Sequence, residues 1–402
     1  MKSSISPFGT RSCGYVLSAA LAGAVLSPVG IAQAQQLQLE EILVTARKRE
    51  ESIQDVPVSV TSISRELNEA TLRRLDDIQS FTPNVYIRNT AGTPGGAAIS
   101  IRGVSYQEID KSLDPSIGVI MEGMYLGTSS GSLLQNFDIG RVEVLRGPQG
   151  TLFGKNTIGG VINVIRSPVT MDWGLDAIVT LGEDDRNDYK LVANMPIIED
   201  TLGVKLFGMD LNSDGYIENT TFGDDVGGDD YTTYGLATRW TPSENFAVQL
   251  HYEHEENETD AGTWANFNQA DDLVCILGAN PAFPFWGAAQ GCQAFDTGSD
   301  EDHNSQNGRN DGETNQDYYN LTLNYDMGDW GLTAIAGYIN RNENSRLEYD
   351  ANSFEFLTVV SDTDYEQFSQ EVRLVGSIGD VALTTGLYYW DSEYSTDSRT
   401  LD

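Results

Sequence analysis

The sequence of 402 residues is poor in groups that could do chemistry, because it has only three histidines and 24 basic residues against 60 acidic ones. His251 and His254 are three positions apart, a spacing that places them on opposite faces of a strand. So few histidines give neither a nucleophile paired with a base nor a metal site. The net charge of −36 opposes binding to nucleic-acid phosphates. We therefore expect no catalytic residue, no cofactor, no bound metal and no nucleic-acid partner.

Long apolar runs are absent after residue 35, so no membrane-spanning helix is expected there. Before that point lie a positively charged start, an apolar run at 15–26 that is too short to span a bilayer, and an A-x-A pattern at 32–34. These three features are typical of a signal peptide, here over residues 1–34. The mature protein is therefore expected to be exported.

Cysteine is also scarce. Cys13 leaves with the signal peptide, and Cys275 and Cys292 remain in one loop rich in proline and glycine. Export brings the chain into an oxidising compartment, which favours a disulfide between these two residues. Closing a loop of this length contributes on the order of 3 kcal/mol. We therefore predict a Cys275–Cys292 disulfide.

Positive charge becomes rare in the second part of the chain. Residues 36–167 hold 13 basic and 15 acidic residues, whereas residues 168–402 hold 9 basic and 45 acidic residues. This shift in composition predicts two domains with a boundary near Pro168. Two interpretations of the acidic part stay open, namely solvated acidic loops and a cation-binding surface.

The first domain has the pattern of a small α+β fold. Residues 64–80 carry a helical periodicity that ends before Pro83. Short β-prone runs punctuated by glycine surround it. These runs are 56–63, 85–88, 98–104, 117–127, 141–147 and 160–165.

The second domain shows nine runs in which apolar and polar residues alternate, as in β-strands. In one of them Leu250 and Tyr252 share a face opposite His251 and Glu253. The runs lie near 176–183, 188–197, 203–211, 231–241, 245–253, 319–326, 330–340, 364–376 and 381–390, and tight links alternate with long ones at 212–230, 257–316 and 343–362. Strands of about ten residues with short turns at one end and long loops at the other are typical of outer-membrane β-barrels.

The stretch 141–165, RVEVLRGPQGTLFGKNTIGGVINVI, resembles the plug-domain signature of TonB-dependent outer-membrane receptors. The segments VPVSVTSIS, SIRGV and IGVIMEGMYLG are also similar to plug segments. A phosphate-binding loop does not fit, because Asn156 stands where a Ser or Thr would hold magnesium. The resemblance covers essentially the whole mature chain. It implies an α+β plug domain followed by antiparallel transmembrane β-barrel strands.

The resemblance also implies a set of plug-motif residues. They are Arg102, Gly103, Arg146, Gly147, Pro148, Gly150, Gly154, Gly159 and Gly160. The glycines permit tight turns and close backbone approach. Arg102, Arg146 and Arg166 are forked donors that need carboxylates in a confined lumen. Glu253, Asp326 and Glu371 of the second domain are the predicted partners.

A short β-prone run precedes the first domain and comprises Glu41, Ile42, Leu43, Val44 and Thr45. Charged residues at 47–51 follow it. Taken alone, such a run suits either a first strand of the domain or pairing with the sheet edge of a partner. Its similarity to the TonB box of the family favours the second interpretation, with a TonB-type energy transducer as the partner.

As a whole, the resemblance implies a monomeric receptor in the lipid of the bacterial outer membrane. Its expected function is TonB-dependent import of a small extracellular ligand, such as a siderophore, a cobalamin, haem or an oligosaccharide. Two alternatives remain: a secreted, soluble β-rich protein that binds or acts on carbohydrate, and a passive porin. The plug motif argues against both.

The expected domains are a signal peptide (1–34), a periplasmic segment (35–52), the plug domain (53–167) and a partial barrel (168–402). Barrels of this family have about 22 strands, and nine strands are fewer than half of that number. We therefore expect this chain to be a fragment or truncated product that does not transport by itself.

Overall fold

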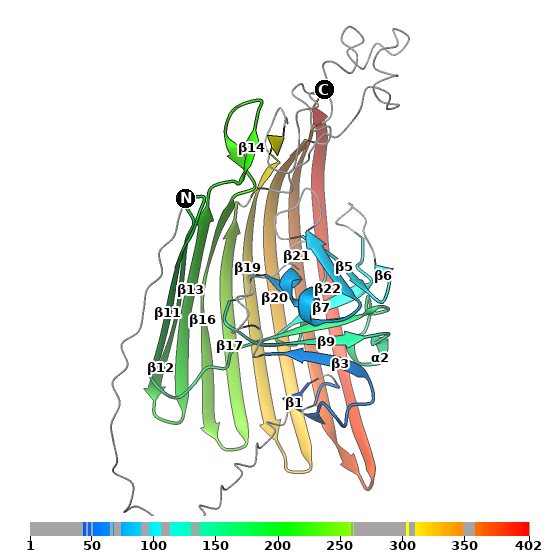
Figure 1. The fold of residues 1–402 in the computed structure, drawn as a ribbon. Coiled ribbons are helices and arrows are strands. Elements are labelled where there is room, and N and C mark those ends of the chain that lie inside the picture. The colour runs from blue at the N-terminus through cyan, green and yellow to red at the C-terminus, as the bar shows by residue number, and fades with distance from the viewer. Residues whose placement is uncertain are drawn as a thin grey trace, which may run out of the picture. The chain divides into compact units, whose positions relative to one another are not determined.

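The structure is a computed structural model in which most of the chain after residue 42 can be described. The described residues are 43–45, 47–49, 51–64, 67, 74–89, 96–105, 113–129, 135, 137–258, 260, 303–304, 310–348 and 358–401. They form mainly β-strands, as Figure 1 shows. Across these ranges no helix has the length and apolar character needed to cross a membrane.

The plug domain centres on a five-stranded mixed sheet with the strand order β3-β9-β10-β7-β8. Its strands are β3 (Ser59–Ile63), β7 (Ile117–Met121), β8 (Met124–Leu126), β9 (Ile139–Arg146) and β10 (Gly160–Arg166). β10 pairs in parallel with β7 and antiparallel with β9, so it lies in the middle of the sheet. A strand covered on both faces has a nearly continuous apolar sequence. This explains the full burial of Val161, Ile162 and Val164 in β10.

A second, three-stranded antiparallel sheet completes the plug core. It consists of β4 (Val85–Asn89), β5 (Ala97–Ile101) and β6 (Val104–Ser105), and the 3-10 helix η1 (Leu75–Phe81) precedes it. Leu75 and Ile78 of η1 belong to the same buried cluster as Val164 of β10. The helix predicted over 64–80 is therefore observed only as η1, because the residues between 64 and 74, Leu67 excepted, lie outside the described part.

Two runs predicted as single strands are hairpins instead. The run 117–127 turns at Glu122 and Gly123, and the run 98–104 turns at Arg102 and Gly103. All four residues have positive φ, from +49° to +81°, as the two central residues of a type I′ turn do. The prediction failed because Arg and Glu are not turn-forming residues, and only the glycine in each pair signals the reversal.

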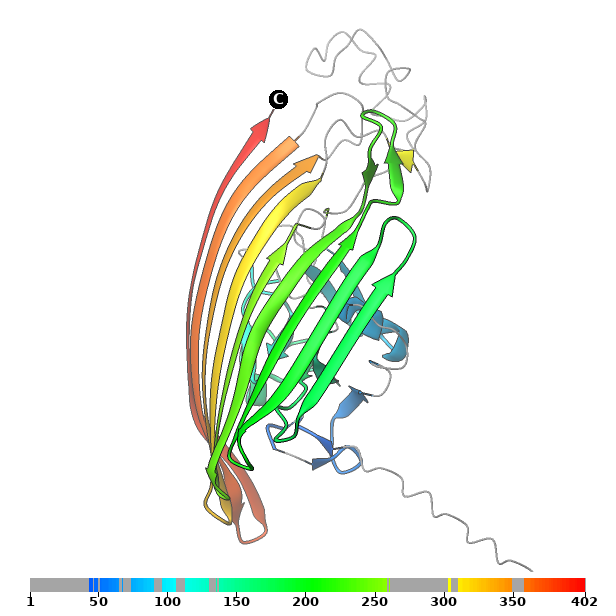
Figure 2. The same ribbon diagram turned by 90° about the vertical axis from the view of Figure 1, so that its left-hand side faces the viewer.

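The second domain is a nine-stranded antiparallel sheet, called the large sheet below. Its strands are β11 (Gly174–Leu181), β12 (Asn187–Ile198), β13 (Leu202–Ser213), β16 (Asp229–Ser243), β17 (Phe246–Asn257), β19 (Asp311–Asp326), β20 (Trp330–Glu348), β21 (Thr358–Ile378) and β22 (Val381–Leu401). Each strand pairs with the next in sequence, so the predicted antiparallel barrel strands are confirmed. Figure 2 shows the sheet curving along its strands, and β11 and β22 are its two edges in the described part of the chain.

Several strands are longer than the alternating pattern predicted. β20, β21 and β22 have 19, 21 and 21 residues, and their extra length lies towards the long loops. There β20 continues through polar residues such as Asn344 and Arg346, which still pair in register with β21. The prediction stopped early because alternation ends where neither face of a strand is apolar, although the backbone ladder continues.

Short elements accompany these two domains. Near the start of the described chain, β1 (Leu43–Val44) pairs with β2 (Glu51–Ser52). In the long-loop region, β14 (Ile217–Asn219), β15 (Asp225–Val226) and β18 (His303–Asn304) form a small sheet. The helix α2 (Gly150–Phe153) occupies one turn between β9 and β10.

Candidate functional site

The predicted coupling run is held at its C-terminal end by the plug core. Leu43 and Val44 form β1, and Val44 is fully buried. The backbone N–H of Thr45 donates to Oε1 of Glu143 at 2.8 Å, and Asn163 donates to Oε2 of the same carboxylate at 3.2 Å. Glu143 is fully buried in β9, so Thr45 satisfies part of a charge that water cannot reach. Glu41 and Ile42 lie outside the described residues.

The charged residues that follow connect this segment to the large sheet. Arg47 donates to Glu51 at 2.6 Å across the β1–β2 turn, and Arg49 also contacts Glu51. Burial tends to raise the pKa of Glu51, but the two guanidinium groups outweigh it and hold that pKa below its usual range. Lys48 points the other way and pairs with Glu371 of β21, with 2.5 Å between Nζ and Oε2. Burial lowers the pKa of Lys48, and Glu371 offsets only part of that effect.

The glycine-rich motif forms a closed connection between β9 and β10. The N–H of Gly147 donates to the carbonyl of Gly159 at 2.9 Å, and the N–H of Gln149 donates to that of Thr157 at 3.0 Å. Gly147 has a φ of +102°, and a side chain at Gly160 would meet the carbonyl of Leu145. Both positions therefore require glycine. Of the other predicted motif positions, Pro148 follows the turn, Gly150 begins α2, and Gly154 ends it with a φ of +80°.

The predicted arginine–carboxylate pairs form only in part. Arg146 donates to the carbonyl of Pro83 and to Oγ1 of Thr61, and Arg102 lies in the β5–β6 turn beside Gly103. In the described part of the chain, neither arginine forms an ion pair with a carboxylate. Asp326 accepts from the N–H of Gly328 in a tight turn of the large sheet.

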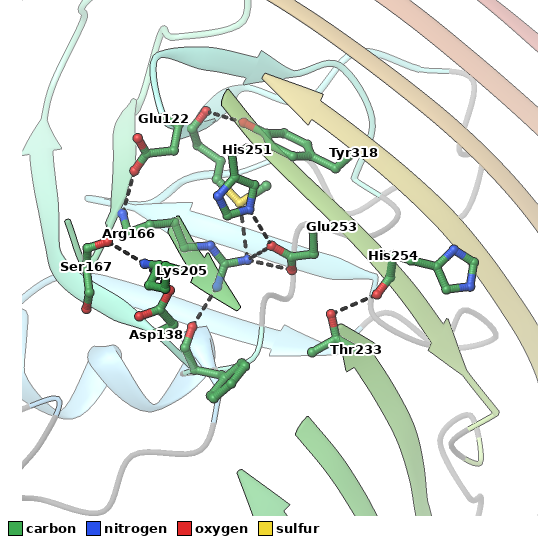
Figure 3. A network of polar contacts seen from close by, with 12 residues as sticks. Glu122, Asp138, Arg166, Ser167, Lys205, Thr233, His251, Glu253, His254 and Tyr318 are labelled. Carbon is green, nitrogen blue, oxygen red and sulfur yellow. Dashed lines mark hydrogen bonds and ion pairs between the residues drawn. The ribbon is translucent and has the colours of Figure 1, made fainter. Parts of the chain in front are cut away.

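Arg166 does find its predicted partner, as Figure 3 shows. Its Nη2 lies 2.5 Å from Oε2 of Glu253 in β17, and its Nη1 donates to the carbonyl of Phe137 at 2.6 Å. His251 contacts the same carboxylate at 3.0 Å. Beside this pair, Lys205 of β13 forms an ion pair with Asp138. Buried charges therefore fix the last strand of the plug to the large sheet.

The β7–β8 hairpin has the most specific attachment to the large sheet. Tyr318 and Asn320 of β19 donate to the carbonyls of Met121 and Glu122, at 3.0 and 3.2 Å. Gln367 of β21 donates to the carbonyl of Tyr125 at 2.7 Å and accepts from the N–H of Gly127 at 2.9 Å. Met124 fills the space above Gly337 of β20, where a side chain would collide with it. Backbone carbonyls of the hairpin thus receive donors from β19 and β21, and β20 between these strands packs against Met124.

Sequence analysis did not single out Tyr318, Asn320 or Gln367. The sequence does indicate the side on which these residues lie, because each one falls on the strand face opposite to the apolar residues. That face is shared by many polar residues, so the pattern does not distinguish residues that bind the plug from residues that line the lumen.

The predicted disulfide falls in a part of the chain that the structure does not describe. Cys275 and Cys292 lie outside the described residues.

Carboxylates do gather near the long loops, where Glu256, Glu258 and Glu313 bring oxygens within 4.8 Å of one another. All three side chains are exposed, an arrangement equally compatible with solvated loops.

Comparison with known proteins identifies a known domain and a set of similar proteins. Residues 52–161 match the family model of the TonB-dependent Receptor Plug Domain. The chain is 28% identical over 215 residues to the vitamin B12 transporter BtuB of Vibrio vulnificus, covering 52% of this chain and 34% of that protein. It is 30% identical over 233 residues to the pesticin receptor of Yersinia pestis, covering 56% and 33%. Residues 52–161 thus carry a TonB-dependent receptor plug domain, and the chain is similar to TonB-dependent outer-membrane receptors.

Solved receptor structures share the fold. The ferric yersiniabactin uptake receptor FyuA from Yersinia pestis superposes with a TM-score of 0.70 at 21% identity, over 85% of this chain and 50% of that one. The ferripyoverdine receptor of Pseudomonas aeruginosa gives a TM-score of 0.68 at 15% identity, over 89% and 45%. This chain spans about a third of the length of the curated relatives it matches. Those relatives are named as a transporter and as a receptor.

Proposed function

We propose that the protein imports a scarce small molecule across the outer membrane in a TonB-dependent manner. The observation that carries this proposal is the position of Leu43 to Thr45. This run pairs with β2 through only two residue pairs and is fastened to the plug core through Glu143. A partner that adds a strand here can therefore transmit a pull directly to the centre of the plug.

Metal chelates are the proposed class of cargo. Relatives and structural neighbours are named for vitamin B12, ferric yersiniabactin and ferripyoverdine. The proposed organisation is a signal peptide over 1–34, a coupling segment over 35–52, a plug over 53–167 and barrel strands over 168–402. The family match over 52–161 and the first large-sheet strand at Gly174 support these boundaries.

The test is a proline substitution in the coupling run. Val44→Pro removes a ladder donor and fixes φ, so strand addition by the partner should fail. Val44→Thr keeps both the N–H and the β-branched shape and serves as the matched control. Cells carrying this coupling segment and plug in a receptor with a closed barrel are given radiolabelled vitamin B12 and radioiron-loaded yersiniabactin, and surface binding and uptake are measured separately.

We expect Val44→Pro to abolish uptake of the probe that the unmodified receptor imports, while surface binding stays unchanged. Val44→Thr should retain uptake. Equal uptake by the proline and threonine variants would place the coupling segment elsewhere, and binding of neither probe by the unmodified receptor would rule out these two chelates.

A further inference from the structure

A cavity of about 240 Å³ lies between the plug and the last two strands of the large sheet. Its plug side is lined by Lys48, Ile120, Tyr125 and residues 150–154, which form α2 and its C-terminal cap. Glu371 and Arg373 of β21 and residues 384–388 of β22 line its sheet side. The last of these ranges begins three residues after β22 starts, close to the tight β21–β22 turn. The cavity is therefore near the same end of the sheet as the coupling segment (Figure 1).

Lys48 crosses this cavity. Its Nζ pairs with Glu371 on the sheet side, and the same atom lies 5.4 Å from the centre of the Phe153 ring on the plug side. Cavities that hold small organic molecules measure roughly 300–1,000 Å³. The resting cavity is smaller, so a wall has to move before cargo can enter, and Lys48 is the lining residue that joins the plug side to the sheet side through an ion pair.

Among the residues that line the cavity, Lys48 is the nearest in sequence to the coupling run. It follows Thr45 by three residues, and its backbone N–H donates to the carbonyl of Thr45 at 2.8 Å. An extended chain gains at most about 3.6 Å per residue, so little slack separates the two. A pull on residues 43–45 is therefore transmitted to the Lys48–Glu371 ion pair after only a small extension of the chain.

Release of Lys48 leaves no buried charge without a partner. Arg373 lies 2.5 Å from the other oxygen of Glu371 and stays paired with it after Lys48 withdraws. An isolated buried carboxylate would be costly, whereas a paired one is not. Lys48 itself regains water, which favours its charged form because burial had lowered its pKa.

The rest of the plug side includes a hairpin that is hydrogen-bonded to the large sheet. Ile120 and Tyr125 belong to the β7–β8 hairpin, whose carbonyls accept from Tyr318, Asn320 and Gln367. These contacts do not involve the coupling segment. Val44 packs in the same buried cluster as Ile120 and Tyr125, so a pull on residues 43–45 also loads this hairpin, and its hydrogen bonds to the large sheet hold it while Lys48 is withdrawn.

We infer that this cavity is the periplasmic part of the import passage and that Lys48 is the wall withdrawn to open it. The inference rests on the proposed import function. Glu371, Arg373, Thr384 and Thr385 give the opened passage charged and hydroxyl groups. Leu152, Phe153 and Leu387 add apolar surface, so the passage suits a water-soluble chelate that carries both polar and apolar groups.

The first test needs no cargo and no partner. Thr384→Cys places a thiol on the cavity wall of the purified receptor, and mass spectrometry follows its labelling by a bulky, hydrophilic maleimide. Adding Lys48→Ala should raise the labelling rate about tenfold, equivalent to ~1.4 kcal/mol less opening cost. Lys155→Ala is the matched control, because Lys155 also contacts the large sheet, over Trp390, but does not line the cavity. An unchanged rate with Lys48→Ala, or an equal rise with Lys155→Ala, would overturn the inference.

The second test uses uptake of the probe that the unmodified receptor imports. A Lys48→Cys/Glu371→Cys pair joined by a short thiol crosslinker should stop uptake, and reducing the crosslink should restore it. A Met124→Cys/Gly337→Cys disulfide should leave uptake intact, since it joins the fixed hairpin to the sheet. Uptake through the crosslinked Lys48 pair, or its loss in the Met124 pair, would contradict the inference. Failure of the unmodified receptor to import either probe would count against the proposed function alone, and the labelling result would then decide the inference.

Discussion

At the scale of single residues, charge pairing explains why the end of the plug stays attached to the large sheet. Arg166 and Glu253 are both more than nine-tenths buried, so neither charge is solvated without the other. A pair of this kind adds little net stability relative to apolar residues, but removing one partner is costly. The pair therefore determines where β10 attaches to the large sheet, and it adds little to the free energy of unfolding.

This reasoning predicts a non-additive mutational cycle. Arg166→Gln should destabilise the receptor by about 3–5 kcal/mol, because it leaves the Glu253 carboxylate buried without its main cation. The double variant Arg166→Met/Glu253→Leu should lose much less, since no buried charge remains. Urea unfolding of the purified receptors in detergent measures both. A double variant as unstable as Arg166→Gln would show that the pair does more than neutralise charge.

At the scale of elements, the β7–β8 hairpin shows how a turn missed in the sequence becomes a structural anchor. The sequence IMEGMYLG predicts one strand, and the reversal at Glu122 and Gly123 produces two. The reversal presents carbonyls to the polar face of β19 and β21. Sequence pattern placed Tyr318 and Gln367 on that face, but only the three-dimensional pairing of plug and sheet shows what they bind.

The packing of this hairpin predicts a difference between two glycines of one strand. A Cβ at Gly337 would lie 2.9 Å from Cγ of Met124, whereas a Cβ at Gly331 meets nothing closer than 4.0 Å. Gly337→Ala should cost about 1–3 kcal/mol, because Met124 is buried and cannot swing aside. Gly331→Ala should be nearly neutral. Adding Met124→Ala to Gly337→Ala should recover part of the loss, and thermal unfolding compares the variants. Equal losses of stability at the two glycines would mean that the Met124 side chain changes rotamer at little cost in free energy.

At the scale of the whole molecule, periodicity predicted the fold better than it predicted the interface. Alternation gave all nine strands of the large sheet and the correct faces of Leu250 and His251, because burial on one side imposes a period of two. It underestimated strand lengths wherever both faces are polar, as in β20 beyond Arg341. The Lys48–Glu371 contact joins residues 323 positions apart, and no local pattern encodes such a pairing.

The outward face of the large sheet carries the last prediction. Leu250 of β17 pairs directly with Leu321 of β19, and both side chains are exposed despite being apolar. We expect lipid to cover this face. Glu313 lies on the same face of β19, eight residues away, or about 27 Å at the rise of a strand. Arginine in the middle of a lipid-facing strand costs about 2–4 kcal/mol, and near the membrane surface it costs about 0–1 kcal/mol.

Leu321→Arg should therefore destabilise the receptor in phospholipid vesicles far more than Glu313→Arg. The second variant should be neutral or slightly stabilising, since it places a positive charge beside Glu256 and Glu258. Urea unfolding from the vesicles measures both free energies. In detergent-free buffer the unmodified chain should remain insoluble, because the apolar band has no cover there. If Leu321→Arg cost no more than Glu313→Arg, water and not lipid would border this face. That result would favour the alternative of a secreted, soluble β-rich protein over a membrane receptor.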